Sequence, residues 1–290
     1  MTSSIKRLYA ALVLALALGL LVAGCGSSDD DSSGDTGTTA AAECEPGKLP
    51  TRSDGVLTIA TDKPAYPPYF EDDDPTNGEG FESAVAYAIA DQLGYPAAKV
   101  KWTVEPFNSS YAPGPKDFDF DVNQISITPP REKVVDFSSP YYVANQAVLA
   151  LKDSEAAKAT TLEELQDAKL GVQIGTTSLE AAEEVIEPSS KPEVFNNSTD
   201  VVTALKNGQI DAIVVDLPTA LYLTAVEVPE ATVTGQFSAP GGDEWGALLA
   251  KDSPLTACVS AAVEELESSG ELEEITTQWM STAAGAPVLE

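Results

Sequence analysis

Histidine is absent from this 290-residue chain and basic residues are scarce: 16 Lys and Arg stand against 46 Asp and Glu, which gives a formal net charge of −30. Without histidine the chain cannot form Ser-His-Asp or Cys-His catalytic sites, or metal sites ligated by histidine. The shortage of Lys and Arg argues against binding to a phosphate backbone, which requires clustered cations. The composition therefore disfavours conventional hydrolases and nucleic-acid-binding proteins, and we expect neither a cofactor nor a metal.

Long hydrophobic runs are also scarce, and the clearest one lies near the N-terminus. Lys6 and Arg7 precede the apolar run Leu8–Val22, which is short for a transmembrane helix of roughly 20 residues. The run ends in Leu-Val-Ala-Gly-Cys at 21–25, which resembles a bacterial lipobox. The resemblance implies a lipoprotein signal peptide over 1–24 and lipidation of Cys25 with acyl chains such as palmitate, which anchor a protein firmly. An ordinary signal peptide followed by a chance cysteine is the alternative.

The segment after the lipobox is rich in Gly, Ser, Thr and Asp and has no aromatic residue. Such a composition cannot bury enough apolar surface to offset its ordering entropy, so 25–44 is predicted to be a flexible acidic tether. The sequence thus predicts an extracytoplasmic protein, lipid-anchored to the cell membrane at the cell surface or in the periplasm.

Only three cysteines occur in the chain, and two of them, Cys44 and Cys258, lie in the remaining part. An even pair in an oxidising compartment favours a disulfide between the N-terminal arm and a late helix. The alternative is two unrelated small residues, with Cys258 buried on the apolar side of its helix.

From Gly55 onward, short strand patterns alternate with helical ones, which is typical of an α/β fold with largely parallel sheets. The predicted strands are Val56–Ala60, Lys99–Val104, Val122–Ile127, Ala147–Leu151, Leu170–Ile174, Ala212–Val215 and Trp245–Ala250. The predicted helices are Phe81–Leu93, a short one opened by a capping box at Thr161–Glu164, Thr176–Ile186, Thr199–Lys206, Pro254–Ser268 and Glu271–Trp279.

Four segments carry a resemblance to a known family. They are Thr61-Asp62 with Tyr66–Glu71 and Gly80-Phe81-Glu82; Ser126–Arg131 with Val135–Tyr142; Gly171–Thr177; and Ala204–Ala212 with Asp216. In this order and spacing, the chain resembles the extracytoplasmic solute-binding proteins of polar amino-acid ABC transporters (bacterial solute-binding protein family 3). The resemblance runs from about Gly55 to Trp279.

The resemblance implies a two-lobed fold of the type II periplasmic-binding-protein class, with two hinge-crossing strands. Its sheets would be mostly parallel, with an antiparallel crossing strand. Lobe one would comprise 45–142 plus 243–290, and lobe two 143–242. The lobes would close on a ligand like a hinge.

A free amino acid is a zwitterion, so its binder needs an anion clamp and a carboxylate close together. Arg131 offers a planar bidentate fork to a carboxylate, and the resemblance assigns that role to it, with Ser126 beside it. Gly175-Thr176-Thr177 precedes a predicted helix whose free N–H groups favour an anion, so Thr176 and Thr177 would hold the same carboxylate. Asp216 is the candidate for the ligand ammonium.

A second candidate acceptor for the ligand ammonium is the main-chain carbonyl of Gln124. Each assignment also has a structural alternative: Arg131 pairing with Glu132 or Asp136 on the surface, Asp216 capping the helix that begins at Leu217, Thr176 and Thr177 capping theirs, and Ser126 serving as an ordinary strand residue.

The residues expected to contact the ligand side chain lie in lobe one. Tyr66 and Phe107 match aromatic positions that sandwich the ligand side chain in relatives, with core packing as the alternative. Asp62 matches a position that contacts cationic side chains in some relatives and also occurs where ligands are uncharged. The chain departs from the family pattern at Glu82-Ser83-Ala84, at Asn123-Gln124-Ile125 in place of Ala-Gly-Met, and in the Pro/Gly-rich segment after Phe107.

The resemblance implies a monomeric, lipid-anchored substrate-binding component of an ABC importer. It would bind a polar amino acid, either cationic or uncharged, and deliver it to a membrane permease with a cytoplasmic ATPase. One alternative is a dehydratase-like enzyme on the same fold, for which Glu71 and Glu82 are the nearby acid–base candidates. The other alternative is a ligand-sensing lipoprotein that feeds a signalling receptor.

Overall fold

The computed structural model describes residues 44–280 and 286–290. The predicted signal peptide (1–24), the lipidation site Cys25 and nearly all of the predicted tether lie outside the described residues. Among the helices of the described part, none is long and apolar enough to cross a membrane.

The first of two five-stranded sheets has the order β2-β1-β3-β10-β4. Its strands are β1 (Leu57–Thr61), β2 (Val100–Val104), β3 (Phe120–Asp121), β4 (Val135–Val143) and β10 (Glu244–Ala250). β1 pairs in parallel with β2 and β3, whereas β10 pairs antiparallel with β3 and β4. We call this sheet and its covering helices lobe one.

The second sheet has the same plan, with the order β7-β6-β8-β5-β9. Its strands are β5 (Gln146–Leu151), β6 (Leu170–Gln173), β7 (Glu193–Phe195), β8 (Ala212–Asp216) and β9 (Ala231–Phe237). β6 pairs in parallel with β7 and β8, and β5 pairs antiparallel with β8 and β9. With its helices this sheet forms lobe two, so the predicted two-lobed α/β class is confirmed, with both sheets mixed rather than mostly parallel.

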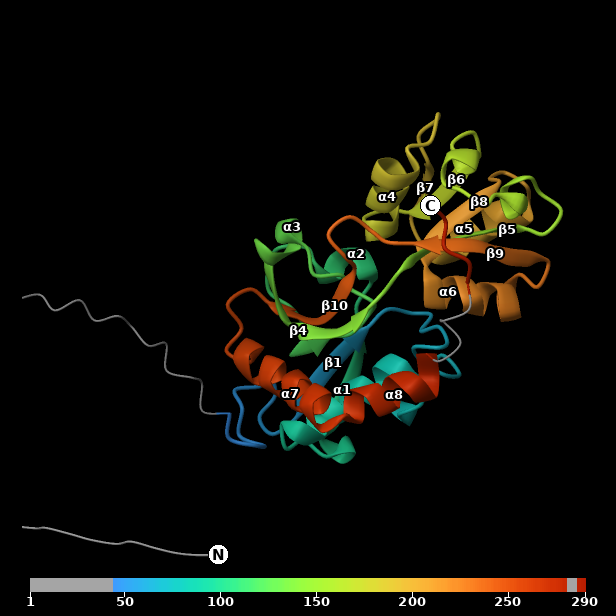
Figure 1. Cartoon of the computed structure of the whole chain (residues 1–290). Helices are drawn as coiled ribbons and strands as arrows, with labels where there is room; N and C mark the ends of the chain where they lie inside the picture. The colour runs from blue at the N-terminus through green and yellow to red at the C-terminus, as the bar shows by residue number, and fades with distance from the viewer. Residues whose placement is uncertain (1–43, 281–285) are drawn as a thin grey trace, which may run out of the picture. The chain divides into compact units, whose positions relative to one another are not determined.

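The chain passes between these sheets at two neighbouring places (Figure 1). β4 ends at Val143 in the first sheet and β5 begins at Gln146 in the second. β9 ends at Phe237 and β10 returns to the first sheet at Glu244. Main-chain and side-chain bonds tie the two crossings together, because Ala144 N–H donates to the Asp243 carbonyl and Asn145 Nδ2 donates to Gln236 Oε1, each over 2.8–2.9 Å.

Helices bury the apolar faces of both sheets. Around lobe one they are α1 (Phe81–Gln92), α2 (Phe107–Ser110), α3 (Pro129–Glu132), α7 (Thr256–Ser269) and α8 (Glu271–Met280); around lobe two they are α4 (Thr177–Ala181), α5 (Ser198–Lys206) and α6 (Leu217–Tyr222). Two π-helical turns, Ala182–Ile186 and Leu223–Glu227, extend α4 and α6, and short 3₁₀ turns occupy Pro75–Asn77, Ala97–Lys99, Ala156–Lys158 and Glu163–Leu165. α1, α7 and α8 share one core with β1 and β10, whereas α5 and α6 share another with β5 and β8.

The bounds predicted for the strand Val122–Ile127 are wrong. The strand is β3, which comprises only Phe120 and Asp121, and Gln124 interrupts the run with a left-handed φ of 48°. Beyond it, Ser126 pairs with Trp245 of β10 through an isolated antiparallel bridge. Strands β4, β7 and β9 were not predicted.

The last five residues lie on lobe two, which corrects the assignment of all of 243–290 to lobe one. Val288 forms a parallel bridge with Gln236 of β9, where Gln236 N–H donates to the Pro287 carbonyl and Leu289 N–H donates back to Gln236. Leu289 is buried against Gly235, where a Cβ atom would lie 2.6 Å from the leucine Cγ. In Figure 1 the C-terminus accordingly lies beside the second sheet, away from α8.

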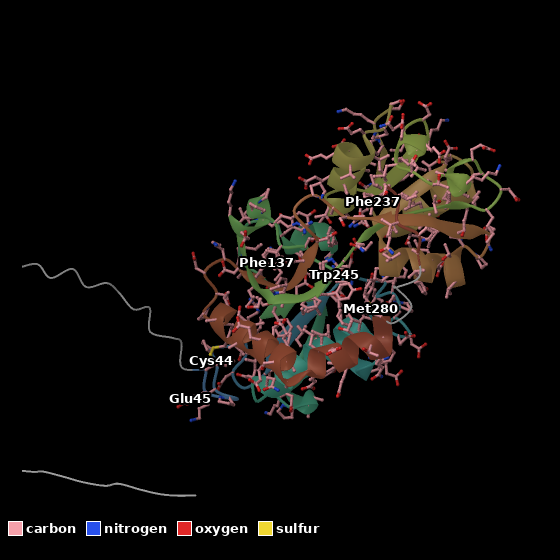
Figure 2. The ribbon with its side chains drawn as sticks, in the orientation of Figure 1. Cys44, Glu45, Phe137, Phe237, Trp245 and Met280 are labelled. Atoms are coloured by element: carbon pink, nitrogen blue, oxygen red, sulfur yellow. A yellow bond between two sulfur atoms is a disulfide. The ribbon has the colours of Figure 1, made fainter. Side chains whose placement is uncertain are left out.

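The predicted disulfide is present: Cys44 is bonded to Cys258 of α7 with an S–S distance of 2.01 Å (Figure 2). Cys258 is also buried in the core of lobe one, but the bond excludes the alternative of two unrelated cysteines. The bond closes a loop with a sequence separation of 214 residues. A cross-link over so long a loop removes much conformational freedom from the unfolded chain.

Removing this cross-link should destabilise the protein. The double variant Cys44→Ser, Cys258→Ala is expected to lose about 2–5 kcal/mol of unfolding free energy, which lowers the melting temperature by about 5–15 °C. Differential scanning calorimetry with and without reductant measures this. Reductant should lower the melting temperature of the unsubstituted protein alone; equal values for both proteins would contradict the prediction.

Candidate functional site

A cavity of about 220 Å³ lies between the two lobes and is lined by residues of both. Two tyrosines of lobe one reach across it. Tyr66 Oη is 2.8 Å from Thr199 Oγ1 at the start of α5, and Tyr69 Oη is 2.7 Å from Thr219 Oγ1 in α6. These direct bonds between the lobes describe a closed arrangement.

Eight of the nine predicted ligand-binding residues line this cavity: Asp62, Tyr66, Phe107, Gln124, Ser126, Thr176, Thr177 and Asp216. They are dispersed over the chain from position 62 to 216, and the fold gathers them at the ends of β1, β6 and β8 and in the loops between. Arg131 is the exception, because it does not belong to the cavity lining.

Arg131 instead lies buried at the contact between the lobes. It belongs to α3, where its main-chain N–H donates to the capping hydroxyl of Thr128. Its guanidinium donates to the carbonyl of Ser126 over 2.7 Å and to that of Gly175 in lobe two over 2.9 Å. Its position excludes the surface alternative, and Asp136 pairs with Lys251 instead.

Aromatic rings hold this guanidinium from lobe one. The Arg131 Cζ atom lies 4.7 Å from the ring centroid of Tyr111 and 5.6 Å from that of Phe107, as expected for cation–π contacts. Burial lowers the pKa of Arg131, and the nearby Asp243 and Asp216 carboxylates oppose this shift.

Gly175 has to be glycine for two reasons. Its φ is 75°, and a Cβ atom would collide with the hydroxyl of Tyr111. The close approach brings the Gly175 carbonyl within reach of Arg131, so the glycine of the Gly-Thr-Thr segment serves the contact between lobes.

The two threonines that follow have different partners. Thr176 is the N-cap of α4: its hydroxyl accepts from Leu179 N–H over 3.2 Å and donates to the Gln173 carbonyl over 2.8 Å. The Thr177 hydroxyl lies 3.2 Å from Ser126 Oγ and donates over 3.2 Å to Asp243 Oδ2. Thr176 therefore caps α4 with its hydroxyl and also lines the cavity, whereas Thr177 contacts lobe one.

Asp216 occupies the N-cap position of α6, yet its side chain makes no capping bond. Its Oδ1 accepts from Gln146 Nε2 over 2.6 Å, and the residue lines the cavity. The capping alternative is therefore not what the structure contains. Burial raises the pKa of Asp216 well above its usual range, and the neighbouring Asp243 adds to the effect, whereas Gln146 and Arg131 oppose it.

Gln124 adopts the left-handed conformation, with a φ of 48°, which glycine reaches with less strain than any other residue. Its main-chain N–H donates to Glu82 Oε1 over 2.7 Å, and its side-chain amide donates to Glu82 Oε2. Glu82 also accepts from Tyr141, and burial raises its pKa to about 7. The side chain of Gln124 thus compensates for the unfavourable backbone through a buried carboxylate of α1.

The predicted side-chain pocket is built from aromatic and acidic residues. Asp62 accepts from the main-chain N–H of Lys63 over 2.6 Å and from that of Phe107 over 3.1 Å, so it fixes the start of α2. The ring centroid of Tyr66 lies 6.3 Å from that of Tyr222 in lobe two. Aromatic surfaces from both lobes therefore bound the cavity.

Several residues of this region were not predicted from the sequence. Tyr69, Tyr222, Glu227 and Lys206 line the cavity, and Gln146 and Asp243 lie directly behind it at the two crossings. Tyr69 belongs to the family-like segment Tyr66–Glu71 and could have been included. Lys206 likewise lies in the family-like segment Ala204–Ala212. The others sit in segments without a motif, and only the folded arrangement brings them together.

Asp121 of β3 is a buried carboxyl that does not belong to the cavity lining. Ser110 donates to its Oδ2, whereas Oδ1 has no partner among the described residues. Burial raises the pKa of Asp121 to about 8, with smaller contributions from Glu82 and other acids.

This shift should make stability depend on pH. Between roughly pH 4 and pH 8 the folded protein retains a proton that the unfolded chain releases, so the unfolding free energy falls as pH rises. Asp121→Asn removes this loss. Urea unfolding at pH 5 and pH 8.5 should show the variant gaining on the order of 3 kcal/mol relative to the unsubstituted protein. The exposed control Asp91→Asn should not gain; parallel pH profiles for all three proteins would refute the assignment.

The chain is similar in sequence to a family of known proteins. A family model described as bacterial extracellular solute-binding proteins, family 3, matches residues 57–282. The chain belongs to this family.

Several relatives are similar over most of their length. The arginine-binding extracellular protein ArtP of Bacillus subtilis is 31% identical over 217 residues, covering 73% of this chain and 82% of that protein. The ABC transporter glutamine-binding protein GlnH of the same species is 30% identical over 284 residues, covering 95% of this chain and 97% of that protein. A solved structure of an ancestral arginine-binding protein bound to arginine has a TM-score of 0.64 at 30% identity, covering 77% of this chain and 97% of that chain.

Membership of the family indicates an extracytoplasmic amino-acid-binding protein of the ABC transporter class rather than an enzyme. Neither acid–base candidate of the enzyme alternative, Glu71 or Glu82, lines the cavity. Glu82 serves the fold instead, as the acceptor for Gln124 and Tyr141.

Proposed function

We propose that the chain is the lipid-anchored substrate-binding component of an ABC importer and that its ligand is an amino acid with a cationic side chain. The protein binds the ligand as a monomer between the lobes and passes it to a membrane permease driven by a cytoplasmic ATPase. Asp216 accepts from the ligand ammonium, with the Gln124 carbonyl as a second acceptor. Ser126, Thr176, Thr177 and a reoriented Arg131 hold the carboxylate.

The observation that carries the choice of ligand is the charge of the cavity lining. Asp62, Asp216 and Glu227 contribute three carboxylates, against the single ammonium of Lys206. Asp216 is used by the ligand ammonium, so Asp62 and Glu227 remain for a positive side chain. Tyr66, Phe107 and Tyr222 supply ring faces on which a guanidinium or the stem of a lysine can pack.

Asp243, which is almost fully buried behind the lining, acts in the same direction, because a buried carboxylate creates a negative potential that water screens poorly. Glu82 and Asp121 are also buried, but burial raises their pKa values to about 7 and about 8, so neither supplies a full negative charge at neutral pH. The names of two relatives, both arginine-binding proteins, agree with this preference.

A binding panel tests the ligand class. Calorimetry with the chain from Gly26 onward should show arginine, lysine or ornithine binding with a Kd of about 1 µM or tighter, which corresponds to about −8 kcal/mol. Asp62→Asn and Glu227→Gln should each weaken the cationic ligand about 10-fold or more, because each removes one carboxylate from the side-chain pocket. Arg131→Ala should abolish binding.

A control ligand and two contrary outcomes complete this test. Glutamine, which lacks the side-chain charge, should bind with similar affinity to the unsubstituted protein and to the two charge variants. Preferential binding of glutamine or glutamate by the unsubstituted protein would refute the cationic class, and consumption of a cyclic carboxylate would refute the transport role.

The lipid anchor is tested separately at Cys25. In bacterial cells, the unsubstituted protein should fractionate with membranes, and the mass of its N-terminal peptide should include a diacylglycerol on the cysteine. Cys25→Ala should shift the protein to the soluble or secreted fraction, because the acyl chains supply the attachment. Identical fractionation of both proteins would contradict lipid anchoring.

A further inference from the structure

The two chain crossings between the lobes meet at a pair of buried polar side chains, Gln146 and Asp243. Gln146 is the first residue of β5, after the first crossing, and Asp243 is the last residue before β10, at the end of the second. Their exposed fractions are 0% and 1%. Neither belongs to the cavity lining, and neither has a role in the ligand clamp as proposed above.

Hydrogen bonds connect this pair to both halves of the clamp. Gln146 Nε2 donates to Asp216 Oδ1 over 2.6 Å and also to Asp243 Oδ2. Asp243 Oδ2 accepts in addition from the hydroxyl of Thr177 over 3.2 Å. One buried amide therefore bridges two carboxylates, of which one faces the cavity and the other holds a residue expected at the ligand carboxylate.

The pair is also incompletely satisfied. Among the described residues, neither Asp243 Oδ1 nor Gln146 Oε1 has a hydrogen-bond partner. Burying an acceptor without a partner costs free energy, and apolar residues could fill the same place without that cost. These two polar side chains lie at the hinge and are hydrogen-bonded to residues that line the cavity, which points to a role in binding.

We propose that Asp243 and Gln146 are positioning residues that aim the Asp216 carboxylate at the ligand ammonium and hold the Thr177 hydroxyl on the carboxylate side. The inference rests on the proposed amino-acid site. Both residues lie where the chain crosses between the lobes. The positions of the Asp216 carboxylate and the Thr177 hydroxyl therefore depend on the hinge being closed.

The charges around Asp216 add a second consequence. The titratable and charged groups that face it are Asp243, Arg131, Glu82, Tyr69 and Tyr142. Two carboxylates bridged by one amide repel each other, so in the free protein Asp216 binds a proton more readily. The arriving ammonium favours the ionised carboxylate, and the proton passes to solvent. Binding should therefore release protons, and affinity should fall as pH drops through the range where the free Asp216 becomes protonated.

A thermodynamic cycle, in which the ligand and the residue are each changed in turn, tests the positioning role. The probes are arginine and 5-guanidinopentanoate, which is arginine without its α-ammonium group. In the unsubstituted protein arginine should bind at least 100-fold tighter. In Gln146→Met, and in Asp243→Leu, this ratio should shrink at least 10-fold, because Asp216 is no longer aimed at the ammonium.

The conservative variant Asp243→Asn separates position from charge. Its amide oxygen can still accept from Gln146 and Thr177, so the affinity ratio should be retained within about threefold. Without the repelling charge, proton release measured by calorimetry in two buffers of different ionisation enthalpy should decrease, and the pH midpoint of affinity should move down. This rescue would not follow from a merely structural role.

A matched control is Asp119→Asn. Asp119 is similarly buried and accepts from the main-chain N–H groups of Arg52 and Thr58, away from the cavity. Its substitution should lower the melting temperature without changing the affinity ratio or the proton release.

The outcomes distinguish this inference from the proposed function. If another amino acid of the panel is the ligand, the same cycle is run with it and its deamino analogue. Binding by the unsubstituted protein with an unchanged ratio in folded Gln146→Met and Asp243→Leu overturns the inference alone. Absence of binding by every amino acid overturns both.

Discussion

The guanidinium of Arg131 donates one hydrogen bond to a carbonyl of lobe one and another to a carbonyl of lobe two, and much of the closed arrangement depends on it. Tyr111 and Phe107 fix its position from one side, and Gly175 allows the close approach on the other. A zwitterionic ligand would compete for the same donors, because an ionised carboxylate accepts more strongly than a peptide carbonyl. Under the proposed function, the ligand carboxylate would replace the Gly175 carbonyl as a partner of Arg131, which would link closure to binding.

Much of this organisation could be predicted from the sequence because it follows from local patterns. Phe81–Leu93 and Glu271–Trp279 form helices close to the predicted ranges, since their apolar spacing and the glycines at their ends are local signals. Eight of the nine predicted binding residues line the cavity, and they could be predicted because the family resemblance ran along most of the chain. The Cys44–Cys258 pairing was likewise accessible from composition and compartment.

What could not be predicted depends on distant contacts. The strand expected at Val122–Ile127 has the right composition, but Gln124 interrupts it with a left-handed backbone that donates to Glu82, which lies 42 positions away. Asp243 and Gln146, separated by 97 positions, meet only because both crossings pass through the same point. No spacing pattern in the sequence indicates this contact, and glutamine and aspartate are both ordinary residues at these positions.

The last five residues bring a single side chain, that of Gln236 in β9, into two contacts at once. Its main chain pairs with Pro287 and Leu289, and its side-chain amide donates to the carbonyl of Ala286. The oxygen of the same amide accepts from Asn145 at the first crossing. One residue therefore fastens both the final segment and a crossing, so the attachment of the final residues is coupled to the geometry of the hinge.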